Sequence, residues 1–392
     1  MTGFEAYADT EDRIAIRDTV RDICNKFDDA YWRDLDASGE FPFEFTKAIS
    51  EGGWLGIAMP EEFGGGGLGI TEACIMLQTI AGSAGGIAAS SAVHINIFGP
   101  HAMVVHGTDE QKARWVPNMV NGTTRACFGV TEPDAGLDTT HLSTRAVLDG
   151  DKYIVNGRKM FISTAQEADK IMLLARTTPL EECARPTDGL TIFFTDFNRD
   201  YIETREIEKM GRHSVDTNAL FIDDLPVPVE DRIGEEGKGF YYLFDSLNPE
   251  RMLTAAEAIG LGRRSLSYAS KYAKERVVFG RPIGKNQAIQ HPLAESWSEL
   301  YAAEMLLLHA ADLYDRNEKC ALEANAAKYL AADAAWKATD RAIRTHGGAG
   351  YMTEFNVERH HRESYIPLIG PVSRELVLSF IAERGLGMPK SY

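Results

Sequence analysis

The spacing of apolar residues changes twice along the chain, and this change constrains the fold more than any other feature. From Thr10 onward, apolar side chains recur every three or four residues, which is typical of one face of a helix; they are Ile16, Val20, Ile23, Phe27 and Tyr31. Past Gly122 the apolar runs become short and rich in β-branched and aromatic residues, which favours strands. The helical spacing returns from Gly239. The sequence therefore predicts helices, then strands, then helices.

We predict three domains on this basis: a helical N-terminal domain over residues 1–122, an antiparallel β domain over 123–236 and a C-terminal four-helix bundle over 237–392. The bundle would use a helix after Asn248, two long helices, the second ending at Gly347-Gly348, and a shorter helix from Ser373. In the β domain, Asn156-Gly157 lies between two strand-like runs and predicts a tight hairpin turn.

Composition narrows the possible partners and the compartment. A net charge of -17 and a pI near 5.1 disfavour nucleic acid and anionic membranes as partners. No apolar run is long enough to span a bilayer and no signal peptide is recognisable, so we expect a cytoplasmic protein without membrane insertion. Five cysteines without CxxC spacing indicate reduced thiols, and no metal-binding motif is present, although His360 and His361 are adjacent.

One glycine-rich stretch imitates a nucleotide-binding motif. "GGGGLG", Gly64 to Gly69, satisfies the GxGxxG pattern and precedes a helical run. A dinucleotide-binding turn also needs a parallel βαβ unit and an acidic residue about twenty positions further on. The segment "AGSAGGIAASSAVHINIF" contains no acidic residue. We therefore interpret Gly64–Gly69 as a flexible loop.

Five segments, in order through nearly the full chain, resemble the acyl-CoA dehydrogenase family: "GWLGIAMPEEFGGGGLG", "CFGVTEPDAGLDTTHLSTRA", "IVNGRKMFIS", "ERVVFGRPIGKNQAIQHPLAE" and "THGGAGYMTEFNVERHHRE". The resemblance implies the same α, β, four-helix-bundle fold and a homotetramer, or dimer, with FAD at subunit interfaces. It also implies oxidation of an acyl-CoA thioester to the trans-2-enoyl-CoA, with electrons passed to an electron-transferring flavoprotein or similar acceptor. Such a reaction needs a flavin to accept a hydride and a carboxylate to remove the α proton.

The resemblance assigns the flavin ring to residues of the β domain. Val130 and Thr131 of the VTEP segment would contact the ring, while Phe161 and Ser163 would cover and hydrogen-bond its other side. The family usually has Trp-Ile-Thr where this chain has Phe161-Ile162-Ser163, which keeps an aromatic face and a hydroxyl. A second departure is Leu137, where a serine is common, so that a hydroxyl near the flavin or substrate is lost.

The resemblance assigns the rest of the cofactor to the C-terminal helices. Arg276 and Gln287 match positions that bind the diphosphate of FAD from a neighbouring subunit, and Phe279 lies in the same turn. Without the resemblance, Arg276 would be read as a cation closing a helix C-terminus. The adenosine part would lie against a segment that contains Arg344, Gly347 and Gly348, with Arg344 in place of a common glutamine.

The catalytic base is the main departure from the family pattern. Many members carry the base glutamate at the position of Pro371, which cannot accept a proton. Other members place it immediately before an arginine on the first bundle helix, which points to Glu250, followed by Arg251, with Glu375 in reserve. Asn248 and Arg251 match positions that line the thioester end of the substrate.

Glu250 also has an ordinary structural interpretation. Asn248 is a good N-cap, Pro249 suits the first helical position, and a first-turn acid complements the helix dipole. Such a position would lower the pKa of Glu250, and an acyl chain packed over the carboxyl would raise it.

Two other functions remain open from the sequence. Pro371 leaves room for a flavoenzyme of the same fold with different chemistry, such as a monooxygenase or a desulfinase-like lyase. A non-catalytic acyl-CoA-binding subunit is the third possibility, although a protein without flavin would have little physical need of the VTEP and FGRPI segments.

Overall fold

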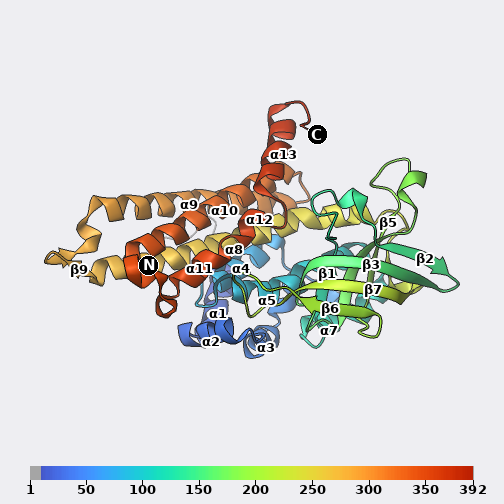
Figure 1. The fold of residues 1–392 in the computed structure, drawn as a ribbon, viewed down its shortest axis with the longest axis horizontal. Coiled ribbons are helices and arrows are strands. Elements are labelled where there is room, and N and C mark those ends of the chain that lie inside the picture. The colour runs from blue at the N-terminus through green and yellow to red at the C-terminus, as the bar shows by residue number, and fades with distance from the viewer. Residues whose placement is uncertain (1–9, 392) are drawn as a thin grey trace.

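The computed structural model describes residues 10–391, which form a helical N-terminal region, a twisted sheet and a bundle of long helices (Figure 1). Thr10 caps the first helix by accepting the N–H of Arg13. The apolar stripe predicted from Thr10 is divided between two helices, because Asp28 caps a second helix through the N–H groups of Ala30 and Tyr31. The N-terminal helices are α1 (Glu11–Cys24), α2 (Asp29–Ser38), α3 (Phe43–Glu51), α4 (Ile70–Ala81), α5 (Gly86–Phe98), α6 (His101–His106) and α7 (Asp109–Val120).

The middle of the chain forms one eight-stranded, mainly antiparallel sheet. Its order is β6-β7-β3-β2-β4-β5-β8, with β1 pairing in parallel to β4. Buried aliphatic and aromatic residues of these strands make up a core of the sheet's own. The strands are β1 (Ala126–Gly129), β2 (Arg145–Asp149), β3 (Lys152–Ser163), β4 (Lys170–Arg176), β5 (Leu190–Asp196), β6 (Ile202–Glu206), β7 (Thr217–Pro228) and β8 (Arg232–Ile233).

The hairpin predicted at Asn156-Gly157 is wrong, because both residues lie inside β3. The pairing of β3 with β7 shifts register between Val155 and Gly157, which is the mark of a bulge. Asn156 holds this bulge by donating to Asp224 Oδ1 at 3.0 Å and accepting the Asp224 N–H at 2.9 Å. Asn-Gly is thus used here to bend a strand, and the turn between β2 and β3 falls at Gly150 instead, where φ is 64°.

The C-terminal region is a bundle of long helices that extends away from the sheet. It comprises α8 (Gly239–Glu275), α9 (Gln287–Asp315), α10 (Ala321–His346), α11 (Val357–Glu363), α12 (Ile366–Ile369) and α13 (Arg374–Leu386), with a small hairpin of β9 (Val277–Val278) and β10 (Arg281–Pro282) between α8 and α9. The segment 357–386 is long and apolar enough by composition to cross a membrane, but it is divided among α11, α12 and α13.

The start of α8 corrects the ordinary interpretation of Glu250. The helix begins at Gly239, so Asn248 is not its N-cap and Pro249 is an internal, buried residue rather than the first helical position. Glu250 lies eleven residues after Gly239. The helix dipole acts within the first turn, and it therefore does not lower the pKa of Glu250.

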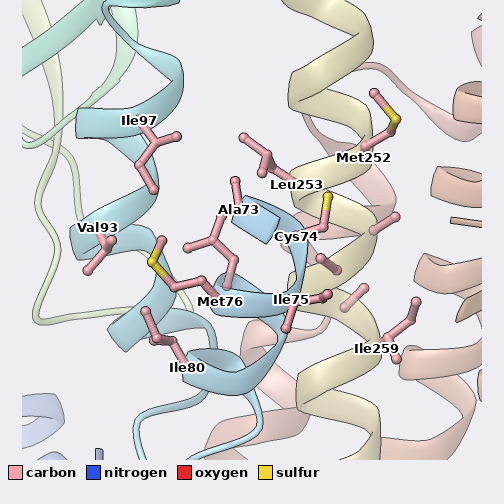
Figure 2. Close-up of a cluster of buried hydrophobic side chains, with 14 of the residues drawn as sticks. Ala73, Cys74, Ile75, Met76, Ile80, Val93, Ile97, Met252, Leu253 and Ile259 are labelled. Carbon is pink, nitrogen blue, oxygen red and sulfur yellow. The ribbon is translucent and has the colours of Figure 1, made fainter. Parts of the chain in front are cut away.

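The N-terminal and C-terminal helices share one apolar core. Figure 2 shows Met76 of α4 and Leu253 of α8 reaching toward α5, and Val93, Ile97 and Ile259 belong to the same buried cluster. All five side chains are buried, with exposed fractions of 6% or less. Because α5 and α8 pack through this core, polar residues on the edges of the two helices are brought to one place.

Candidate functional site

Glu250 lies half-buried on α8 within a group of cationic side chains. Burial raises the pKa of Glu250 to about 7, and the neighbouring His94, Arg251 and Lys328 act in the opposite direction. Desolvation therefore outweighs three favourable charges. A carboxyl group with this pKa can both take up and release a proton near neutral pH, as a general base must.

Lys328 of α10 connects this group to the segment that contains Pro371. Its side chain is 1% exposed, and its Nζ donates to the carbonyl oxygen of Val372 at 2.6 Å. Burial lowers the pKa of Lys328 to about 8, with Arg251 acting in the same direction. The reserve base, Glu375, is exposed in the first turn of α13. The structure thus places Glu250 half-buried within a group of charges and leaves Glu375 exposed.

The three residues assigned to the base and the thioester end occupy one turn of α8. Arg251 Nη1 donates to Asn248 Oδ1 at 3.1 Å, and Arg251 is 8% exposed. The Nε of Arg251 is buried without a hydrogen-bond partner among residues 10–391. Asn248, Glu250 and Arg251 therefore form a compact set that retains a buried, unused donor.

A second carboxylate, more deeply buried, follows on the same face of α8. Glu257 lies seven residues after Glu250, which is about two helical turns or roughly 10 Å along the axis. Its Oε1 is 2.9 Å from Nδ1 of His94 on α5, with both side chains almost fully buried. Burial opposes a charge on His94, but the Glu257 carboxylate outweighs it and raises the pKa of His94 above the ordinary value.

The residues assigned to the flavin ring come together at the end of β1 and in β3. The Met160 N–H donates to the Thr131 carbonyl at 2.8 Å, which places the turn after β1 beside Phe161. Phe161 has a φ of 62° and is 65% exposed, an unusual state for a large aromatic residue. Ser163 lies two residues further on β3 and accepts a hydrogen bond from Arg212 at 3.0 Å.

An ion pair beneath this turn fixes its shape. Lys159 is fully buried, and its Nζ lies 3.0 Å from Glu132 Oε1 and donates to the carbonyl oxygens of Val130 and Leu174. Glu132, the acid of VTEP, also accepts the N–H groups of Ser143 and Thr144. Burial opposes its charge, but Lys159 and these donors lower the pKa of Glu132 to about 2. The glutamate of VTEP therefore holds Lys159, which in turn binds the backbone carbonyl of Val130.

The residues assigned to the remainder of FAD lie at the far end of the bundle. Arg276 follows the last residue of α8, 26 positions after Glu250, which corresponds to about 39 Å of helix. Arg276 directly precedes β9, which Figure 1 shows at the opposite end of the molecule from the sheet. All the assigned residues at this end are exposed: Arg276, Phe279, Gln287, Arg344, Gly347 and Gly348. One chain does not bring its two groups of assigned residues together.

Several polar residues of the site were missed from the sequence. His94 is the one titratable side chain in α5, and Lys159 takes an inward position in the alternation of β3 with Tyr153 and Val155, so both left a detectable signal. Glu257 and Arg212 left none, because the environment of Glu257 arises where α8 meets α5 and that of Arg212 where a loop of the sheet region meets α5.

Family models match three consecutive parts of the chain. Residues 10–123 match the acyl-CoA dehydrogenase N-terminal domain, residues 127–225 the middle domain and residues 237–386 the C-terminal domain. These matches follow the helical, β and helical regions of the structure.

Individual relatives are similar to this chain over almost its full length. Acyl-CoA dehydrogenase FadE12 of Mycobacterium tuberculosis is 34% identical over 396 residues and covers 99% of both chains. The caffeyl-CoA reductase-Etf complex subunit CarC of Acetobacterium woodii is 33% identical, covering 90% of this chain and 93% of its own. The solved glutaryl-coenzyme A dehydrogenase in complex with glutaryl-CoA has a TM-score of 0.93 and 32% identity, covering 99% of this chain and 98% of that one. The chain therefore belongs to the acyl-CoA dehydrogenase family of flavoenzymes.

Proposed function

We propose that the protein binds FAD and oxidises an acyl-CoA thioester to the trans-2-enoyl-CoA, with Glu250 as the base that removes the α proton. The observation that carries the proposal is the place of the Glu250 carboxyl group within α8, where burial raises its pKa to about 7 although three cationic side chains surround it. The site therefore holds a proton acceptor of suitable strength although the usual position carries Pro371.

The residues at the end of β1 and in β3 fit a flavin ring. Phe161 exposes an aromatic face, Ser163 offers a hydroxyl, and the Val130 backbone is held rigid by Lys159. When bound, FAD supplies the acceptor for the hydride that leaves the β carbon. Arg276 and Gln287 would bind its diphosphate, and Gly347 and Gly348 would admit the adenosine, since no atom lies within 4 Å of a Cβ built at either glycine.

The remaining chemistry belongs to the chain's own side chains. Asn248 and Arg251 would orient the thioester end, using donors such as the unpartnered Nε of Arg251. Glu250 takes the α proton onto its carboxylate. Lys328 and His94 stabilise the ionised form of Glu250 before the transfer, and burial favours the protonated form afterwards.

A second copy of the chain would complete the cofactor site. The two groups of assigned residues lie too far apart for one ligand in one chain, and the bundle end exposes Phe279 fully and Tyr351 to 81%. These observations support a homotetramer, or a dimer, in which the bundle end of one copy meets the flavin of another. The relative named as part of an Etf complex supports an electron-transferring flavoprotein as acceptor. Free cysteines fit a cytoplasmic location.

An anaerobic reduction screen tests this function. The purified protein should be yellow, and its flavin absorbance should bleach on mixing with at least one acyl-CoA from a series that varies in length, branching and ring content. Colourless protein that still binds acyl-CoA would favour a binding subunit. Yellow protein that no thioester bleaches, and that a reduced nicotinamide does bleach, would favour a monooxygenase.

A further inference from the structure

Arg212 is a half-buried cation whose hydrogen-bond partners are all neutral. It lies in the loop between β6 and β7, where its Nη1 donates to Ser91 Oγ of α5 at 3.1 Å and its Nη2 to Ser163 Oγ of β3 at 3.0 Å. A weaker contact joins Nη2 to Thr217 Oγ1 at 3.5 Å. The Nε atom is buried and has no partner within residues 10–391. Arginine at such a place is normally paired with a carboxylate in two-point fashion.

The backbone of Arg212 is also held in an uncommon conformation. Its φ is 59°, in the left-handed region that residues with a Cβ rarely adopt. Strain of this kind is retained where the surrounding structure requires one side-chain position, and it concentrates at binding sites. Burial also lowers the pKa of Arg212 from its ordinary value, although Glu257, Glu363 and Asp216 act in the opposite direction.

His94 and Glu257 lie beside Arg212 and make a polar patch on the α5–α8 side of the site. Ser91, which binds Arg212, is one turn before His94 on α5. His94 Nδ1 lies 2.9 Å from Glu257 Oε1, so the one carboxylate of this group already has a partner, although its charge also acts on Arg212. We call Ser91, His94, Arg212 and Glu257 the distal polar patch. The group of this patch that lacks a hydrogen-bond partner among the described residues is a donor, the Nε of Arg212.

The position of the distal polar patch identifies which part of a substrate would reach it. Asn248 and Arg251 are assigned to the thioester end, and Glu257 lies about two turns beyond Glu250 on the same face of α8. An acyl group that extends past Glu250 between α5 and α8 would therefore meet the patch with the part remote from the thioester. An alkyl chain there would leave the Arg212 Nε buried and unpaired, which is unfavourable.

We propose that the distal polar patch selects acyl groups that carry a hydrogen-bond-accepting oxygen remote from the thioester, which Arg212 binds through its Nε. This inference rests on the proposed acyl-CoA site and names its substrate class. A carboxylate and a carbonyl both supply such an oxygen. Discrimination of this kind is strong, because the analogue without the oxygen leaves a buried donor unpaired.

Equilibrium binding tests the proposal without requiring turnover. Calorimetry is carried out on the flavin-loaded protein with Glu250→Gln present throughout, so that proton removal does not disturb the measurement. The ligands are saturated acyl-CoA thioesters of increasing length, each unsubstituted, with a terminal carboxylate or with a terminal ketone. At the best length, we expect an oxygenated form to bind at least about tenfold more tightly than the unsubstituted form. The carboxylate and ketone arms then show which oxygen is preferred.

Arg212→Met should remove this preference while changing the affinity for the unsubstituted thioester by less than about twofold. Arg205→Met, at an exposed arginine of β6 paired with Glu203, is the matched control and should keep the preference. If Arg212→Met does not retain flavin, Arg212→Lys replaces it, and the preference should fall because the fork of donors is lost.

Four results have distinct meanings. Equal binding of all three forms at every length would overturn the proposal, as would a preference that Arg212→Met leaves intact. A shift in the flavin reduction potential of ligand-free Arg212→Met, with the preference unchanged, would also overturn it and assign Arg212 to the flavin through Ser163. Failure of every CoA thioester to bind would instead contradict the proposed function itself.

Discussion

Two groups of buried charges in this protein differ in how completely they are satisfied. Under the turn after β1, Lys159 and Glu132 form an ion pair at 3.0 Å, and carbonyl oxygens and N–H groups occupy their remaining bonding capacity. Between α5 and α8, Glu250 makes no short ion pair among the described residues, and Arg212 and Arg251 each keep a buried Nε without a partner. The difference separates charges that hold a shape from charges available for a ligand.

The buried ion pair of Lys159 and Glu132 should show the largest effect on the free energy of unfolding. Lys159→Met leaves Glu132 buried without its cation, and we expect the free energy of unfolding to fall by about 3–5 kcal/mol. Chemical denaturation measures this loss. The double variant Lys159→Met, Glu132→Gln should lose less than the sum of the two single variants, and strict additivity would show that the pair is not coupled.

Proton removal should follow the ionisation of Glu250. Because the base acts as carboxylate and its pKa is about 7, the rate of flavin reduction by acyl-CoA should fall about tenfold per pH unit well below that value in the free enzyme. Rapid mixing across the pH range gives the profile. A rate that stays constant down to the ordinary range of glutamate would show that no group with a raised pKa takes the proton.

The carboxyl group of Glu250, which has no short ion pair among the described residues, should also make the free energy of unfolding depend on pH. Burial raises the pKa of Glu250 from 4.5 to about 7 in the folded state, so its contribution is fully present below 4.5 and is lost as the pH rises through about 7. Glu250→Gln removes this loss. Relative to wild type, the variant should gain about 1 kcal/mol between about pH 6 and about pH 8, measured by denaturation at both values. An opposite sign would indicate that the carboxylate is stabilised by its neighbours.

An exposed ion pair should show the smallest effect on the free energy of unfolding. Arg344 Nε lies 2.8 Å from Asp340 Oδ2, but the Arg344 side chain is 78% exposed. Arg344→Ala should change the free energy of unfolding by less than about 1 kcal/mol, because solvent screens such a pair. If Arg344 binds the adenosine part of FAD, the affinity for added FAD should fall instead, as titration of flavin-depleted protein would report.

The sequence predicted the fold through patterns that do not depend on tertiary contacts. The change in apolar spacing and the family segments gave the α, β, α order. The hairpin at Asn156-Gly157 failed because Asn156 could bind Asp224 on β7, a residue 68 positions away. The helix start at Asn248 failed because a buried proline inside a helix imitates a first-turn proline.

Residues of the site were predicted only where they belong to a sequence motif of the family. Glu250 was found because it precedes Arg251 at a family position. Its raised pKa could not be predicted, because it depends on burial in the folded protein. His94 and Arg212 were missed because their roles arise where α5 meets α8 and where a β-domain loop meets α5. Such contacts join residues more than one hundred positions apart.

The most direct test of the central claim is the rate of anaerobic flavin reduction in Glu250→Gln, compared with Glu375→Gln. Both variants should retain flavin and bind acyl-CoA. We predict that Glu250→Gln reduces its flavin about 10² to 10⁴ times more slowly than wild type, while Glu375→Gln is close to wild type. Reduction of Glu250→Gln at the wild-type rate, or loss of reduction in Glu375→Gln alone, would contradict the assignment of the α-proton base.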